Sequence, residues 1–159
     1  MARRQRAVGS ALVLGLVLLA FPASAASVQV PKTIPFAKSA RVRAAIQNEC
    51  GLQTMVPAAI VDHSSDAELV DGKGNLDLEI TQVHAPGGWV FSGPKWLEVT
   101  GKLHRGGKLV GTFRAKRFST DPTAGGVCGM LAKCAQNIGV DVAQWLQSPT
   151  MNAEIGDAQ

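Results

Sequence analysis

The stretch of sequence that decides the fold is residues 97–116, LEVTGKLHRGGKLVGTFRAK. Apolar and polar side chains alternate from Leu97 to His104 and again from Leu109 to Lys116. Because successive side chains of a strand point to opposite faces of a sheet, this pattern predicts two strands, each with an apolar and a polar face. We therefore expect residues 97–116 to form an antiparallel hairpin that turns at its paired glycines.

The register of this hairpin depends on the length of its turn. A two-residue turn at 106–107 would pair apolar-face residues with polar-face residues and so mix the two faces. A three-residue turn at 105–107 keeps the faces separate and offers Gly107 for the left-handed third position. It also sets Glu98 opposite Arg114, an opposite-charge pair worth about 0.2–1 kcal/mol. We therefore predict the three-residue turn.

A helix is expected after the hairpin, from about Gly126 to Gln147. Apolar residues recur there at helical spacing, which is typical of a helix with one buried stripe. The stripe consists of Val127, Met130, Leu131, Cys134, Ile138, Val142, Trp145 and Leu146, with Lys133, Gln136 and Gln144 on the opposite side. Gly139 costs about 1 kcal/mol within a helix, so we expect a bend or a close contact at that position.

Other elements are expected before the hairpin. Residues 76–81 alternate cleanly and predict a half-buried strand, whereas residues 66–74 are typical of a loop. A short helix is expected over residues 55–64, with Thr54 as its cap. Residues 41–47 alternate like a strand, although apolar side chains four residues apart also allow a helix. We favour the strand for this segment.

This order of elements is strand, helix, strand, strand, strand, helix. It predicts an α+β fold, with a mainly antiparallel sheet of about four strands and helices packed on one face. The chain then divides into a cleavable signal peptide (1–25), an extended N-terminal arm (26–37), a single α+β domain (38–149) and a flexible tail (150–159).

The signal peptide is predicted from three features in the usual order. Arg3, Arg4 and Arg6 supply positive charge, residues 11–21 form an apolar run, and residues 23–25 read Ala-Ser-Ala, the small residues of a cleavage site. A spanning helix needs about 20 apolar residues, so a membrane anchor is disfavoured. A lipid anchor would need a cysteine just after the apolar run, and the first cysteine here is Cys50. We therefore expect a soluble periplasmic protein, without a lipid anchor or a transmembrane segment after cleavage.

Cleavage also changes the charge of the protein. The chain has 16 Lys and Arg against 12 Asp and Glu; losing three arginines leaves 13 against 12, so the net charge falls from +4 to +1. Such a small charge, in an exported protein, gives no reason to expect binding to nucleic acid.

The chain has 3 cysteines, Cys50, Cys128 and Cys134. In an oxidising compartment we expect two of them to pair. Cys134 lies in the middle of the apolar stripe and is expected to be a small core thiol. A helix start and a strand end can meet at one edge of such a fold, so we predict Cys50–Cys128, with Cys50–Cys134 as the competing pair.

Basic residues gather on the polar face of the hairpin. By alternation, Lys102, His104, Arg114 and Lys116 share this face, and Trp96 and Phe118 fall on it too. These four basic residues form a candidate anion-binding face, for which anionic lipid head groups would be natural partners. Exposed aromatic side chains there favour a binding surface. The alternative is a solvated face neutralised by Asp77, Glu79 and Glu98.

No residue is assigned a catalytic or metal-binding role. Residues 62–65, Asp-His-Ser-Ser, suggest a hydrolase fragment, but neighbours in sequence seldom assemble a catalytic triad. His63, His84 and His104 lie on separate segments without metal-ligand spacing. We therefore predict no metal and no cofactor, and the sequence favours a protein that is not an enzyme without deciding the question.

Two segments carry a resemblance. Residues 49–53 read ECGLQ, and CGML at 128–131 leads on to GVDVAQWL at 139–146. In these segments the chain resembles small uncharacterised exported proteins of Gram-negative bacteria, a resemblance that implies no known activity. The element order also looks like the small α/β modules of envelope accessory lipoproteins, from which this chain departs by lacking the lipid-anchor cysteine.

The function we expect is that of a non-catalytic periplasmic binding or envelope-accessory protein of unknown ligand. Its partners would be envelope proteins or anionic lipid head groups. One alternative is a periplasmic hydrolase that uses His63 or His104. Another is a structural subunit of an envelope complex.

Overall fold

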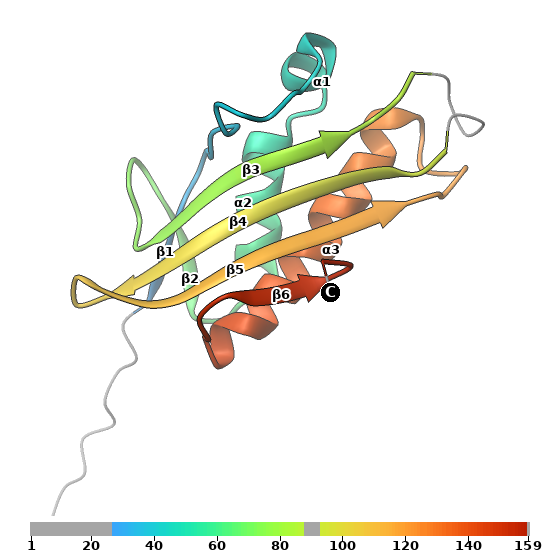
Figure 1. The fold of residues 1–159 in the computed structure, drawn as a ribbon. Helices are drawn as coiled ribbons and strands as arrows, with labels where there is room; N and C mark the ends of the chain where they lie inside the picture. The colour runs from blue at the N-terminus through green and yellow to red at the C-terminus, as the bar shows by residue number, and fades with distance from the viewer. Residues whose placement is uncertain (1–26, 88–92, 159) are drawn as a thin grey trace, which may run out of the picture.

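The computed structural model describes residues 27–87 and 93–158. The predicted signal peptide (1–25) lies outside these residues. The elements are β1 (Val28–Pro31), α1 (Ala44–Glu49), α2 (Leu52–Asp62), β2 (Ala67–Val70), β3 (Leu76–His84), β4 (Lys95–Arg105), β5 (Lys108–Ser119), α3 (Val127–Gln147) and β6 (Ala153–Gly156). The chain has an α+β fold, as predicted, with α2 and α3 behind one face of a twisted sheet (Figure 1).

The main sheet has four strands in the order β3-β4-β5-β6. The pairs β3–β4 and β4–β5 are antiparallel, whereas β6 runs parallel to β5. A second, two-stranded sheet pairs β1 with β2 in parallel. The sheet is therefore mainly antiparallel with four strands, but its fourth strand does not come from the segment that the sequence indicated.

The prediction of a strand at 41–47 is wrong, because this segment leads into helix α1. The segment is helical because the spacing of its apolar residues suits a helix. Ile46 and Cys50, which are four residues apart, are both buried. The next helix, α2, begins at Leu52 rather than Met55, and its N-cap is Gly51 in a left-handed conformation instead of Thr54.

Both ends of the described chain belong to the folded unit. The segment predicted as an extended arm contains β1, whose Val28 and Val30 are buried in the core beside β2, a strand within the predicted loop at 66–74. The segment predicted as a flexible tail contributes β6, which pairs with residues 113–116 of β5. Both terminal segments are ordered because their main chains pair with strands far away in the sequence. A local sequence pattern does not show such pairing.

The hairpin forms, but with a two-residue turn in place of the predicted three-residue turn. Arg105 pairs with Lys108, and Gly106 and Gly107 both have positive φ, 56° and 75°. The pairing then shifts between Leu103 and His104, where an irregularity in β5 adds one residue. This bulge restores the separation of the faces that a two-residue turn alone would have lost.

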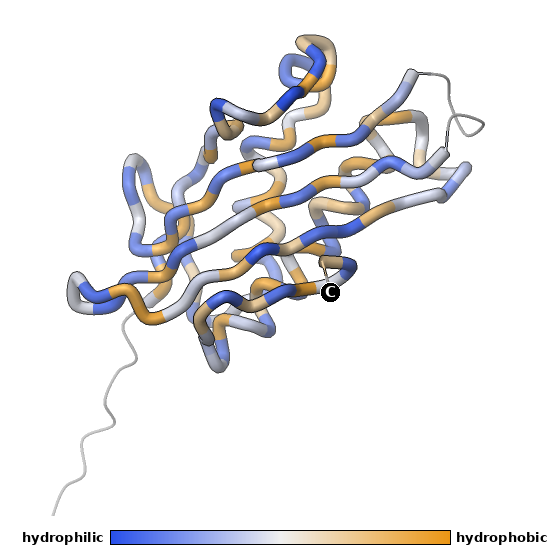
Figure 2. Tube along the Cα trace, in the orientation of Figure 1, coloured by the Kyte–Doolittle hydropathy of each residue, from blue (hydrophilic) through white to orange (hydrophobic). Residues whose placement is uncertain are grey.

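The inner face of the sheet packs on α3. Figure 2 shows the alternation of apolar and polar residues along β3, β4 and β5. The predicted stripe of α3 is buried from Met130 to Leu146, with Val127 half-buried, and Lys133, Gln136 and Gln144 are exposed as expected. From the sheet, Leu97, Val99, Leu103, Phe113 and Ala115 complete the same core.

Gly139 lies at a close contact between α2 and α3, as predicted. A Cβ atom built on Gly139 would lie 2.6 Å from the main-chain carbonyl carbon of Ala59. A real side chain would have to push the two helices apart, so this glycine allows α2 and α3 to approach closely.

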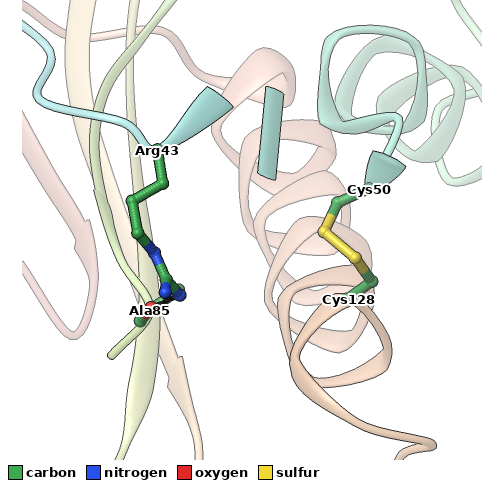
Figure 3. The surroundings of a disulfide bond; sticks show 4 residues. All are labelled: Arg43, Cys50, Ala85 and Cys128. Carbon is green, nitrogen blue, oxygen red and sulfur yellow. Dashed lines mark hydrogen bonds between the residues drawn. A yellow bond between two sulfur atoms is a disulfide. The ribbon is translucent and has the colours of Figure 1, made fainter. Parts of the chain in front are cut away.

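The predicted disulfide Cys50–Cys128 is present, and it joins the end of α1 to the first turn of α3 (Figure 3). Cys134 is a free, buried thiol whose pKa is raised to about 12, mainly because burial disfavours the thiolate. In the described part of the chain, no helix is both long enough and apolar enough to cross a membrane.

We predict that Gly139→Ala lowers the free energy of unfolding by about 1–3 kcal/mol, the usual cost of overpacking. Alanine is the better helix former by about 1 kcal/mol, so a gain in stability would contradict the close contact. Gln136→Ala, on the exposed side of the same helix, is the matched control and should cause no loss. Urea denaturation followed by circular dichroism measures both variants.

We also predict that Cys50→Ala/Cys128→Ala lowers the free energy of unfolding by about 2–5 kcal/mol, because the bridge constrains the unfolded chain. The two cysteines are 78 residues apart, which makes this constraint a large one. A reducing agent should destabilise the wild-type protein to a similar extent and leave the double variant unchanged. Equal stability of the oxidised and reduced wild-type protein would contradict a structural role of the disulfide.

Candidate functional site

The candidate site lies on the outer face of the main sheet, the face turned away from α2 and α3. In the described part of the chain no helix covers the middle of this face (Figure 1). Its side chains include Glu79, Thr81 and His84 from β3, Trp96, Glu98, Thr100, Lys102 and His104 from β4, Arg114, Lys116 and Phe118 from β5, and Glu154 from β6. The four residues of the candidate anion-binding face thus lie on the face where alternation placed them.

Two of these four basic residues lie next to Asp77. Lys102 is paired with Asp77 in the register of β3 and β4. His104 Nδ1 lies 3.7 Å from Asp77 Oδ2. The carboxylate of Asp77 therefore lies beside both Lys102 and His104, the candidate donors at this end of the sheet. Anion binding by these two residues stays a prediction.

Arg114 is held between two carboxylates. Its Nε donates a hydrogen bond of 2.9 Å to Glu154 Oε2, and its Nη1 lies 3.6 Å from Glu98 Oε2. The hydrogen bond to Glu154 is the main reason that the pKa of Arg114 is raised. Glu98 is only 5% exposed and also accepts a hydrogen bond of 2.9 Å from Thr81 Oγ1. We call Thr81, Glu98, Arg114 and Glu154 the ion ladder; it links β3, β4, β5 and β6 across the outer face.

Lys116 is arranged differently. It is paired with Glu98 in register, but its ammonium group lies 4.4 Å from the centre of the Trp96 ring, within the range of a cation–π interaction. His84 stacks on the same indole, with ring centres 5.2 Å apart and planes inclined by 14°. Since β4 lies between β3 and β5, His84 and Lys116 contact Trp96 from opposite sides. We call these three residues the Trp96 sandwich.

A pocket of 340 Å³ opens beside this sandwich. Ser39 and Arg41 line one side of it, and residues 81–84 with Trp96 line the other. A volume of this size lies at the lower end of the range typical of small-molecule sites. The pocket therefore combines hydroxyl, guanidinium, amide and imidazole groups with the edge of a large aromatic ring.

The segments around the pocket lack carboxylates. Residues 38–48 and 80–97 contain lysine, arginine and histidine but no aspartate or glutamate. Among the described residues, no acidic side chain lies within salt-bridge distance of Arg41, His84 or Lys116. At the Trp96 end of the outer face, the described basic side chains Arg41, His84 and Lys116 are therefore not engaged in ion pairs, although Glu98 lies next to Lys116 in register.

The wall that carries Arg41 is held in place from two directions. Arg43 Nη2 donates a hydrogen bond to the carbonyl oxygen of Ala85, just after β3 (Figure 3). The helix that follows, α1, ends at the Cys50–Cys128 disulfide. The contact with Ala85 and the bridge to α3 together fix a segment that has little regular structure of its own.

Sequence reasoning found part of this site. Alternation placed Trp96, Phe118 and Lys116 on one face and indicated a binding surface there. It missed Arg41, which was assigned to a strand, and it treated His84 as an isolated polar residue. The absence of carboxylates from 38–48 and 80–97 was a usable signal, but only the fold shows that these two segments meet.

Of residues 62–65, His63, Ser64 and Ser65 line a separate pocket of 220 Å³ together with Asp66, Arg105 and the C-terminal end of α3. Within the described residues, Ser65 Oγ donates a hydrogen bond to Asp66, and none joins His63 to a serine or an aspartate. The three histidines stay on separate parts of the fold, and no group of His, Cys, Asp and Glu in the described ranges could hold a metal ion.

We predict that Glu98→Ala lowers the free energy of unfolding by about 1–3 kcal/mol, because it leaves Thr81 and Arg114 without a buried acceptor. Glu154→Ala removes the more exposed end of the same ladder and should cost no more than about 1 kcal/mol. Chemical denaturation of both variants tests this order. A larger loss for Glu154→Ala than for Glu98→Ala would contradict the central position of Glu98.

Comparisons with protein-family models, curated proteins and solved structures return no match for this chain. The resemblance to exported proteins of Gram-negative bacteria therefore stays a prediction from the quoted segments. The function of the protein has to be inferred from the geometry of the outer face.

Proposed function

We propose that this chain is a non-catalytic periplasmic binding or envelope-accessory protein that engages its partner through the outer face of the sheet. The observation that carries the proposal is the pocket beside the Trp96 sandwich, where cationic and aromatic side chains lie together and Glu98, the neighbouring carboxylate, is taken up by Thr81 and Arg114. Such a mixture of an aromatic anchor with a few placed polar groups is typical of binding sites.

Exposed apolar surface at the same end supports this function. Phe118 is paired with Trp96 in register and is 53% exposed. A large aromatic side chain so close to a pocket adds apolar contact area for a partner. A partner that binds here would touch Phe118, the Trp96 sandwich and the pocket together.

Export is supported by two observations of different kinds. The first 25 residues have the charge, apolar run and cleavage site of a secretory signal. The folded part contains a disulfide between residues 78 positions apart, and structural disulfides persist mainly in oxidising compartments. The periplasm of a Gram-negative cell has both the export route and the oxidising environment that these features require.

The proposal is tested by affinity capture from a cell-envelope extract. The full chain is expressed with its own signal and recovered from the periplasmic fraction, and its bound proteins and lipids are identified by mass spectrometry. We expect Lys116→Gln/Phe118→Ser to lose most of the captured material. The matched control is Lys73→Gln/Leu109→Ser, which changes an exposed lysine and an exposed apolar residue far from Trp96.

Two results would contradict the proposal. One is equal capture by the outer-face variant and the control variant. The other is recovery of the uncleaved chain from the cytoplasm only. Capture of a stable stoichiometric complex that both variants retain would instead favour a structural subunit.

A further inference from the structure

We infer that the pocket beside the Trp96 sandwich binds a phosphoryl group, with Arg41 and His84 as its main donors. This inference rests on the proposed function and adds the chemical class of the ligand. The same phosphoryl chemistry occurs in lipid head groups and in soluble phosphate esters, and the experiment below separates these two sources.

The first argument is the arrangement of donors around the pocket. Arg41 and Ser39 lie on one wall, and Gln82 and His84 lie on the other. A guanidinium group can bind two phosphate oxygens at once, with hydrogen bonds that are strengthened by charge. A phosphoryl group presents three or more acceptor oxygens, so donors on two walls can bind it together, whereas a carboxylate presents only two.

The second argument is the lack of competition. Arg114 and Arg117, on β5, are already bound to carboxylates: Arg114 to Glu154 and Arg117 to Asp141. Arg41 has no such partner among the described residues, and Glu98, an acidic residue on the neighbouring strand, is engaged in the ion ladder. An incoming anion therefore does not have to displace a protein carboxylate to reach Arg41.

The third argument is preorganisation. The imidazole of His84 is stacked on Trp96, and the opposite side of that indole is covered by Lys116. The main chain near Arg41 is fixed by the hydrogen bond from Arg43 to Ala85. A ring that is already stacked, such as that of His84, loses less conformational entropy on binding, which favours affinity from few contacts.

Lys116 has a supporting role in this arrangement. Its ammonium group lies on the far side of the indole from His84 and contributes positive charge to the same end of the sheet. The field of such clustered charges attracts anions from solution and is weakened by salt. Binding of the phosphoryl group should therefore weaken as the ionic strength rises.

The experiment titrates the exported, oxidised protein, labelled with ¹⁵N, and follows its amide resonances by NMR. The soluble probes are inorganic phosphate, glycerol 3-phosphate and acetate. Binding to the lipid form is measured by co-sedimentation with phosphatidylglycerol vesicles and, for comparison, with phosphatidylcholine vesicles. We expect shifts in residues 39–43 and 81–85 with the phosphate probes, and weaker shifts with acetate.

The variants are Arg41→Gln and His84→Gln, with Lys73→Gln as the matched surface control. We expect Arg41→Gln to weaken phosphate binding about tenfold, the loss typical of one charge-assisted hydrogen bond, and Lys73→Gln to leave it unchanged. Binding to glycerol 3-phosphate in solution identifies a soluble ester as a sufficient ligand. Binding only to phosphatidylglycerol vesicles, with the same loss in Arg41→Gln, identifies the lipid head group.

The inference is overturned if no phosphate probe binds, if acetate binds as tightly as phosphate, or if Arg41→Gln and Lys73→Gln bind equally. These failures differ from failure of the proposed function. If the envelope capture persists and still depends on Lys116 and Phe118, the outer face binds a partner of another chemistry. If phosphate binding depends on Arg41 but nothing is captured from the envelope, the phosphoryl site is supported and the proposed accessory role is wrong.

Discussion

The structure depends on one packing constraint: the apolar stripe of α3 has to be covered by the inner face of β4 and β5. Two glycines make the fit close. Gly111 lies under the indole of Trp145, where a Cβ would come within 2.6 Å of the ring, and Gly139 lies against Ala59 of α2. Phe113 meets Trp145 edge-on, with ring centres 4.9 Å apart. Because α2 and α3 both pack on this side, the opposite face of the sheet is left open.

The open face is divided by its charges. In its middle, the ion ladder joins all four strands and satisfies the carboxylate of Glu98, which a sheet surface would otherwise bury at a cost. At one end, Arg41, His84 and Lys116 carry positive or ionisable groups that form no ion pair among the described residues. This difference is the reason that we propose binding at the Trp96 end rather than across the whole face, because neutralised pairs attract an incoming anion weakly.

The disulfide connects this surface to the core. It ties the end of α1 to α3, and the segment before α1 carries Arg41 on one wall of the pocket. This segment has few apolar residues, so packing alone would hold it weakly. The disulfide and the hydrogen bond from Arg43 to Ala85 hold it against the rest of the fold. The disulfide therefore bears on the geometry of the pocket as well as on the attachment of α1 to α3.

Side-chain patterns were enough to predict the elements that have a complete local pattern. The alternation in residues 76–81 and 97–116, the stripe of α3 and the buried position of Cys134 follow from side-chain periodicity, which burial enforces residue by residue. The α+β class follows from the order of these elements. The sequence favoured the Cys50–Cys128 pair but left Cys50–Cys134 open, and the fold decided between them by bringing the end of α1 to the first turn of α3. The tertiary structure alone decided the turn length and bulge, the helix at 44–49, the pairing of β1 and β6, and the meeting of Arg41 with His84. These features depend on contacts between residues far apart in the chain, and a local pattern contains no record of which distant segment will complete it.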